Sequence, residues 1–248
     1  MTTVILIRHG LTDETGSVMS GWTPGVRLNE RGRAQAAELA ARLRGLALSA
    51  IVSSPLERCV ETAAAILDGR AASAAAVPLA GDGSTAAAGV GPLAVQVDDR
   101  LGEVHYGEWT GRALHDLSRE PLWEVVRTRP SEVEFPGGES LRAMQARAVA
   151  VIHDWNRRLG PDAVWLACSH GDPIRAVVAD ALGIPLDAFG RLAIGPASVT
   201  IIRCTDSGPF VLQVNGSGID AARLAARSQD RHDGTWRDPA AQPLSDLA

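Results

Sequence analysis

The chain has 248 residues, of which 46% are hydrophobic and 21% charged, so it is long enough to bury a large core without disulfides or metal staples. No apolar run approaches the roughly 20 residues of a membrane span, and the first residues lack the pattern of a signal peptide. We therefore expect a cytoplasmic protein without a membrane partner. The net charge of −5 argues against nucleic acid as a partner bound through overall charge.

Short, continuous apolar runs predict buried strands of a mostly parallel sheet. In chain order these runs lie at residues 4–7, 50–52, 95–97 and 164–168. The run at Val95–Val97 is the weakest, and we expect it at the edge of the sheet. Residues 198–202 and 210–214 flank the turn sequence Asp206-Ser207-Gly208-Pro209, which predicts an antiparallel hairpin.

Helical patterns alternate with these strands. Asn29 is predicted to cap one helix, and Ser54-Pro55 and Asp172-Pro173 each predict an N-cap followed by proline at the first helical position. Ser140 is predicted to start a long helix. The buried face of that helix is predicted to contain Leu141, Met144, Ala148, Val151, Ile152 and Trp155. Alternating strands and helices predict a three-layer α/β/α sandwich.

The sequence predicts one catalytic domain over residues 1–215. Residues 69–91 are rich in Ala and Gly with almost nothing large to bury, which predicts a low-complexity surface insertion that is partly disordered. Residues 216–248 are predicted to form a polar C-terminal tail, with one helical piece around residues 221–227.

Basic side chains follow three of the predicted strands. Arg8-His9-Gly10 come directly after the first strand, Arg58 lies in the segment after the second, and Ser169-His170-Gly171 follow the strand at 164–168. Because the carboxyl ends of parallel strands meet at one edge of a sheet, we expect two arginines and two histidines to converge there. Helix N-termini in two of these segments add free N–H groups that suit an anion.

This set of residues predicts a phosphate pocket that contains a nucleophile. Guanidinium groups bind phosphoryl oxygens in pairs, an unprotonated imidazole can attack phosphorus, and a second imidazole, if protonated, adds a cation. A carboxylic acid is then needed to protonate the leaving oxygen. The nearby candidates are Asp98, Asp99, Glu103 and Glu108. All 24 basic residues are Arg, which excludes lysine-dependent chemistry such as a Schiff base or a P-loop. The three cysteines are widely spaced, which excludes a disulfide framework and a Cys-x-x-Cys metal site.

Six blocks in one order resemble the signatures of the histidine phosphatase superfamily, also called the phosphoglycerate-mutase-like family. The blocks span Arg8–Thr12, Leu28–Ala36, Ser53–Ala63, Leu101–Gly111, Pro136–Ser140 and Ser169–Gly171. Together they cover roughly residues 3 to 204. The resemblance implies a phosphoglycerate-mutase-like α/β/α fold with a small helical cap inserted around residues 103–140.

The resemblance also implies roles for individual residues. His9 is implied as the phosphoryl acceptor, and Glu103 as the general acid and then the base. The implied ligands of the phosphoryl group are Arg8, Arg58 and His170. The implied substrate-binding residues are Thr12, Gly21, Tyr106 and Gly171. No metal and no other cofactor is implied. Thr15 stands where many members of the family have Asn.

Departures from the family favour a phosphatase over a phosphoglycerate-type phosphomutase. Val104 replaces the Arg of the mutase block E-R-H-Y-G, the segment after Gly107 is short, and no Lys is present. A mutase must also hold a bisphosphorylated intermediate away from water, although the cap arginines are candidates for that charge. These arginines are Arg112, Arg119, Arg127 and Arg129.

We therefore predict hydrolysis of a small phosphorylated metabolite. The phosphomutase and a non-catalytic phosphate-ligand sensor or binding module remain the alternatives. Pairing through the edge strand near Val95 would allow a homodimer.

Overall fold

The computed structural model of the protein describes residues 1–75 and 93–218. A six-stranded sheet with the order β3-β2-β4-β1-β5-β6 forms its centre. The strands are β1 (Thr2–Arg8), β2 (Ala50–Ser53), β3 (Val95–Val97), β4 (Val164–Ser169), β5 (Val199–Thr205) and β6 (Gly208–Gly216). The four strands from β3 to β1 run parallel, whereas β5 and β6 are antiparallel to their neighbours. The predicted mostly parallel sheet and the predicted hairpin are confirmed.

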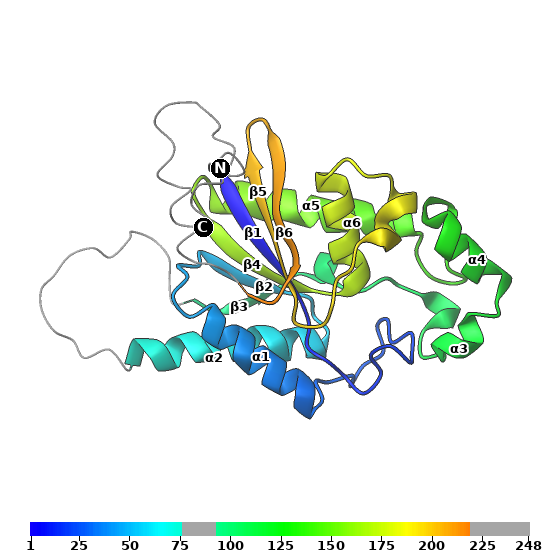
Figure 1. The fold of residues 1–248 in the computed structure, drawn as a ribbon, viewed down its shortest axis with the longest axis horizontal. Helices are drawn as coiled ribbons and strands as arrows, with labels where there is room; N and C mark the ends of the chain where they lie inside the picture. The colour runs from blue at the N-terminus through cyan, green and yellow to red at the C-terminus, as the bar shows by residue number, and fades with distance from the viewer. Residues whose placement is uncertain (76–92, 219–248) are drawn as a thin grey trace, which may run out of the picture. The chain divides into compact units, whose positions relative to one another are not determined.

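Helices cover both faces of this sheet (Figure 1). Helices α1 (Glu30–Arg42) and α2 (Glu57–Ala75) pack together on one face, and α5 (Leu141–Leu159) and α6 (Gly171–Ala181) on the other. This arrangement confirms the predicted three-layer sandwich. The range 103–140 contains the short helices α3 (Leu114–Leu117) and α4 (Pro121–Thr128). Short 3-10 helices lie at η1 (Asp99–Leu101), η2 (Gly107–Trp109), η3 (Pro130–Glu132) and η4 (Leu186–Arg191).

The apolar runs form strands because the sheet buries them on both faces. In β1, the side chains from Val4 to Ile7 are at most 1% exposed, as expected of a central parallel strand. The predicted face of α5 is buried in full, and Ser140 caps this helix by accepting a hydrogen bond from Ala143 N. β3 is an edge strand as predicted, and Val97 in it is 55% exposed.

The predicted start of α2 at Ser54-Pro55 is wrong. The helix begins at Glu57, and its first hydrogen bonds run to Leu56 O. The Ser54 hydroxyl is instead held by tertiary structure, because its Oγ lies 2.8 Å from His170 Nε2. The same oxygen also accepts a hydrogen bond from Leu56 N at 3.3 Å, but Leu56 lies before the first helical residue.

The predicted start of α6 at Asp172-Pro173 is also wrong. The helix begins at Gly171, with His170 at its N-cap, so Asp172 lies inside the first turn. The Asp172 carboxylate accepts hydrogen bonds from Tyr106 Oη at 2.8 Å and from Arg175 Nη1 at 2.9 Å. The Asp172 carboxylate therefore bonds these two side chains instead of capping the helix.

The predicted surface insertion does not start at residue 69. Residues 69–75 continue α2, and the rest of the range 69–91 lies outside the described residues. In the predicted tail, Gly216 still belongs to β6, and the helical piece expected around 221–227 lies outside the described residues. None of the helices that the structure describes is long and apolar enough to cross a membrane.

Two glycines let α1 pack against the segment that follows β1. A Cβ added to Gly32 would lie 2.0 Å from Leu11 O, and one added to Gly10 would lie 2.6 Å from Gly32 O. We expect Gly32→Ala to lower the free energy of unfolding by about 1–3 kcal/mol, because the backbone next to His9 must move. Gly45→Ala is the control, since a Cβ there meets no atom within 4 Å. Urea denaturation of the two variants checks this, and equal stability would contradict it.

Candidate active site

Two histidines distant in sequence lie side by side at the carboxyl ends of β1 and β4. The parallel register pairs Arg8 with Ser169, and His9 N donates to Ser169 O at 3.0 Å. The residue after each strand end is a histidine, so the rings of His9 and His170 have centroids 5.1 Å apart. The strand pairing therefore builds the site directly.

His9 has one ring nitrogen engaged and the other available. Its Nδ1 lies 2.7 Å from Gly10 O, a carbonyl that can only accept, so Nδ1 carries the proton and Nε2 keeps its lone pair. Burial and the charge of Arg58 lower the pKa of His9 to about 3. The ring is therefore neutral at neutral pH, and Nε2 is a nucleophile without further activation.

Two guanidinium groups, buried Arg58 and half-buried Arg8, flank this imidazole, and each has a buried donor without a partner among the described residues. Arg58, which is 2% exposed, donates from Nη2 to Gly21 O at 2.8 Å, while its Nη1 is buried without a partner among the described residues. Arg8 donates from Nη1 to Ile194 O at 2.7 Å, while its Nε is likewise buried and unpaired within the described chain. An unpaired buried donor costs about 1–3 kcal/mol, and an anion between the two groups would satisfy both.

His170 is fully buried at the N-cap of α6. Its Nε2 lies 2.8 Å from Ser54 Oγ and 3.4 Å from Cys59 Sγ. Burial, together with the charge of Arg58, lowers the pKa of His170 well below its usual range. The ring is therefore neutral in this structure, and it is not the additional cation that the sequence allowed for.

Glu103 is the carboxyl group that belongs to this site. Burial raises its pKa to about 7, and the negative charge of Asp172 adds to the effect. Its Oε1 accepts a hydrogen bond from Val104 N at 3.0 Å. A carboxyl group with a pKa near neutrality exchanges a proton readily in both directions, as a general acid and base must.

The other three carboxylates proposed from the sequence lie elsewhere. Asp98 accepts hydrogen bonds from Arg100 and from Trp155 Nε1, and it stabilises the turn at η1. Asp99 and Glu108 are exposed. The charges of Arg58 and Arg8 both act on the pKa of Glu103.

The four expected substrate contacts have different surroundings. Tyr106 Oη donates to Asp172, so its hydroxyl is already paired. Thr12 is 4% exposed, and its Oγ1 lies 2.9 Å from Thr15 Oγ1. Gly21 has a φ of 48° and holds Arg58 through its carbonyl. Gly171 is the first residue of α6.

Sequence reasoning missed Asp172 as a functional residue. It was assigned a capping role, yet its charge acts on Glu103 and its oxygens bind Tyr106 and Arg175. Its position directly after His170-Gly171 was the available signal, because the first turn of that helix faces the same edge of the sheet.

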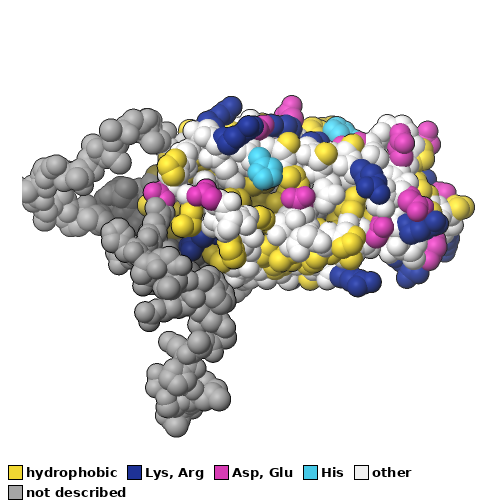
Figure 2. Space-filling model, turned by 90° about the horizontal axis from the view of Figure 1, so that it is seen from above, with side chains coloured by type: hydrophobic (Ala, Val, Ile, Leu, Met, Phe, Trp, Pro, Cys, Tyr) yellow, Lys and Arg dark blue, Asp and Glu magenta, His cyan; other side chains and the backbone are white. Residues whose placement is uncertain are grey.

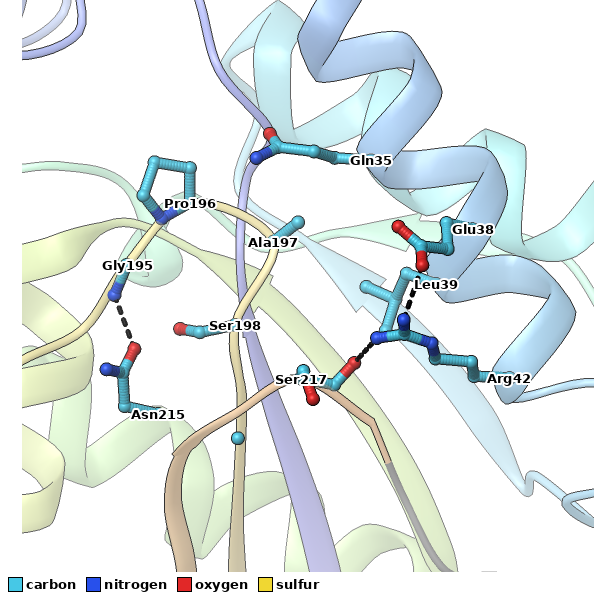
Figure 3. A pocket seen from close by; sticks show the side chains of 11 residues that line it. Gln35, Glu38, Leu39, Arg42, Gly195, Pro196, Ala197, Ser198, Asn215 and Ser217 are labelled. Atoms are coloured by element: carbon cyan, nitrogen blue, oxygen red, sulfur yellow. Dashed lines mark hydrogen bonds and ion pairs between the residues drawn. The ribbon is translucent and has the colours of Figure 1, made fainter.

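A turn behind the His9 segment supports it from the far side. Ala197 N lies 3.1 Å from both Arg8 O and His9 O, and Arg8 N donates to Ser198 O at 3.2 Å. A hollow of about 260 Å³ lies between this turn, α1 and the end of β6, where Arg42 pairs with Glu38 and with the Ser217 carbonyl (Figure 3). None of the candidate catalytic residues lines this hollow.

The model of the histidine phosphatase superfamily (branch 1) matches residues 4–78 and 83–217. The chain belongs to this superfamily. This match confirms the resemblance carried by the six sequence blocks.

The curated relatives of this chain include both phosphatases and mutases. The chain is 28% identical over 225 residues to phosphoserine phosphatase 1 of Hydrogenobacter thermophilus, covering 87% of this chain and 92% of the relative. It is 30% identical over 193 residues to glucosyl-3-phosphoglycerate phosphatase of Mycolicibacterium vanbaalenii, covering 74% and 76% of the two chains. A 2,3-bisphosphoglycerate-dependent phosphoglycerate mutase of Mesorhizobium japonicum is 29% identical over 182 residues, covering 71% and 79%.

Several solved structures share the fold of this chain. Bacillus stearothermophilus YhfR superposes with a TM-score of 0.73 at 27% identity, covering 89% of this chain and 99% of that one. Mycobacterial glucosyl-3-phosphoglycerate phosphatase Rv2419c superposes with a TM-score of 0.71 at 26% identity, covering 87% and 99%. The phosphoglycerate-mutase-like fold predicted from the sequence is confirmed.

The charge of Asp172 provides a test of the pKa of Glu103. Asp172→Asn removes a negative charge that raises this pKa, so we expect the pKa to fall and the basic limb of kcat/KM to move to lower pH. The pH–rate profile for glycerol phosphate, whose alkoxide leaves only with a proton, measures the shift. The exposed Asp116 provides the control variant Asp116→Asn, which should keep the parental limb. A parental limb in Asp172→Asn as well would contradict this assignment.

The same pKa affects stability. The folded value for Glu103, about 7, lies above the ordinary 4.5, so the folded state binds more protons between these values. The stabilisation that this group contributes is complete below about pH 4.5 and is lost as the pH rises through about 7. We expect Glu103→Gln to remove this loss, measured by urea unfolding at about pH 5 and about pH 8. Glu108→Gln, at an exposed site, should retain it, and an identical pH dependence in all three proteins would refute the expectation.

Proposed function

We propose that the protein hydrolyses phosphomonoesters by transferring the phosphoryl group first to His9 and then to water. The observation that carries the proposal is the neutral His9 ring, with Nε2 available, between two guanidinium groups that each have a buried donor without a partner among the described residues. A nucleophile beside a cationic clamp is the arrangement that phosphoryl transfer requires, because the chemistry needs placement and charge neutralisation.

In the first step, Nε2 of His9 attacks phosphorus and the bond between phosphorus and the leaving oxygen breaks. Glu103, in its protonated form, donates its proton to that oxygen. Arg8 and Arg58 neutralise the charge on the phosphoryl oxygens during the transfer. The hydrogen bond from Nδ1 to Gly10 O stabilises the positive charge that develops on the imidazole.

In the second step, water cleaves the phosphohistidine. Glu103, now a carboxylate, accepts a proton from the attacking water, the bond between phosphorus and Nε2 breaks, and His9 is regenerated as the neutral ring. Glu103 is again protonated at the end of the cycle. A phosphoryl dianion between the rings and the guanidinium groups would raise the pKa of His170, which could then contribute a further charge.

The charges of the cap favour hydrolysis over mutase activity. Each of the four cap arginines has a carboxylate partner within the cap: Arg112 with Glu120, Arg119 with Asp116, Arg127 with Glu124, and Arg129 with Glu132. On the face shown in Figure 2, side chains of both signs are interspersed at the end that carries the cap. Val104, at the position of the mutase arginine, is fully buried. A second strong cationic subsite is therefore not supported by these residues.

The substrate is proposed to be a small phosphorylated metabolite. Two first candidates are phosphoserine and glucosyl-3-phosphoglycerate, because two similar proteins are a phosphoserine phosphatase and a glucosyl-3-phosphoglycerate phosphatase. The described residues contain no cluster of three or more His, Cys, Asp or Glu side chains suited to a metal ion. We propose cytoplasmic activity, supported by three free cysteines, and keep the edge strand β3 as the site for a possible homodimer.

Replacement of His9 tests the proposal. We expect His9→Ala to lower kcat for 4-nitrophenyl phosphate at least about a thousandfold, which corresponds to a loss of about 4 kcal/mol or more in transition-state stabilisation. His153→Ala is the control, because His153 is exposed on α5 beside Met1 and Thr2, at the opposite end of β1 from His9. Equal and negligible rates in the wild type and His9→Ala would favour the non-catalytic binding module.

The mutase alternative has its own measurement. With 3-phosphoglycerate as the substrate, the rate of inorganic phosphate release is compared with the rate of conversion to 2-phosphoglycerate. We expect phosphate release to dominate, because the charged groups needed to hold a bisphosphorylated intermediate are paired within the cap. Isomerisation faster than hydrolysis would establish the mutase instead.

A further inference from the structure

The backbone carbonyl of Glu103 accepts hydrogen bonds from two side chains that are distant in sequence. Trp22 Nε1 donates to this oxygen at 2.6 Å, and Arg147 Nη2 donates to it at 2.8 Å. A carbonyl oxygen has two lone pairs, so these donors satisfy it completely. Glu103 lies between η1 and η2, outside any helix or strand, so side chains rather than regular secondary structure fix its backbone.

Arg147, on α5, uses all five of its N–H donors in this cluster. Nη1 donates to Arg100 O at 2.9 Å and to Gly102 O at 2.8 Å. Nη2 donates to Glu103 O and, at 2.6 Å, to Glu139 Oε1, and Nε donates to Glu139 Oε2 at 3.0 Å. No donor is left for a phosphoryl oxygen. The guanidinium therefore orders the backbone of residues 100–103.

The ion pair between Arg147 and Glu139 also fixes the chain after Glu103. Glu139 Oε1 accepts a hydrogen bond from His105 N at 2.9 Å, and Glu139 N donates to His105 O at 2.8 Å. The side chains of Arg147 and Glu139 are only 18% and 15% exposed, so water weakens the pair little. The segment that carries Glu103 is thus held on both sides of this residue.

Trp22 links the same segment to the arginine that faces the nucleophile. The neighbouring residue, Gly21, accepts a hydrogen bond from Arg58 Nη2 at 2.8 Å. The Trp22 ring packs so closely on Gly102 that a Cβ there would lie 2.2 Å away, and it stacks on His105 with a centroid distance of 4.3 Å. Two consecutive residues therefore hold Arg58 and the backbone of Glu103 in one frame.

We propose that Trp22 and Arg147 are positioning residues, which place the carboxyl group of Glu103 for proton transfer by clamping its backbone carbonyl. The proposal rests on the function proposed above, in which Glu103 protonates the leaving oxygen. Proton transfer depends on a hydrogen-bond distance that a shift of about 1 Å destroys. Neither side chain touches the substrate in this account, so each acts through Glu103.

The dependence of rate on the leaving group tests positioning. A 4-nitrophenolate leaves without a proton, whereas the alkoxide of glycerol phosphate needs one, and kcat/KM reports only the steps up to phosphohistidine formation. Trp22→Phe removes one donor but keeps a ring to stack, and Arg147→Lys removes the forked geometry. We expect each to lower kcat/KM for glycerol phosphate by about 10–100-fold and for 4-nitrophenyl phosphate by less than about threefold.

Matched controls separate positioning from general destabilisation. Trp165→Phe also removes an indole donor, which bonds Asn156 Oδ1 at 2.8 Å in the core. Arg142→Lys alters an arginine of the same helix, which donates to Ser131 O at 2.7 Å. Both controls should lower kcat/KM for the two substrates by equal factors. If Arg147→Lys fails to fold, Trp22→Phe decides the question alone.

Glu103→Gln separates failure of this proposal from failure of the proposed function. A leaving-group difference in Glu103→Gln establishes the acid role, and its absence would refute that role itself. If Glu103→Gln shows the difference but Trp22→Phe and Arg147→Lys slow both substrates equally, or slow neither, the positioning proposal is wrong. A difference in all three variants supports it.

Discussion

The pairing of β1 with β4 is the interaction on which the site depends. Its register sets Arg8 beside Ser169, so the next residue of each strand, His9 and His170, emerges at the same edge. Burial on both faces fixes this register. A slip of one residue would turn packed side chains such as Ile5 and Leu166 to the opposite face of the sheet, where they would have to pack against a different layer of helices. The geometry of the reacting groups is therefore a consequence of core packing.

The site holds charged groups in surroundings that are unfavourable for them, and the packing of the core offsets this free-energy cost. Arg58 is buried with one donor unpaired, and it lowers the pKa of both histidines that it faces. Glu103 is half-buried with a pKa near neutrality, and the charge of a second carboxylate, Asp172, acts on it. A bound phosphoryl dianion would satisfy the donors, which explains why the protein retains a costly arrangement. The surrounding sheet and helices bury enough apolar surface to tolerate it.

The sequence predicts a helix cap correctly where the side chain bonds only its own helix, and incorrectly where the side chain has a partner elsewhere in the fold. The predicted caps at Asn29 and Ser140 are confirmed, because each side chain accepts a hydrogen bond from the backbone N–H three residues ahead. Ser54 and Asp172 follow the same pattern, yet their side chains bond His170 and Tyr106 across the fold, which no local pattern reveals. The sequence predicts that Arg8, His9 and His170 converge because they lie at or directly after strand ends, and Arg58 is added from the first turn of α2. Trp22 and Arg147 were missed because they act on a carbonyl oxygen, which leaves no mark on the sequence pattern.

The account turns on a covalent phosphoryl group at Nε2 of His9. Rapid quenching of the enzyme with a ³²P-labelled phosphomonoester, followed by peptide mapping, tests this most directly. We expect a label that is stable in base, labile in acid, located on the peptide that contains His9, and formed and lost at rates compatible with turnover. Label on any other residue, or turnover with no label under conditions in which phosphoenzyme should accumulate, would contradict the mechanism.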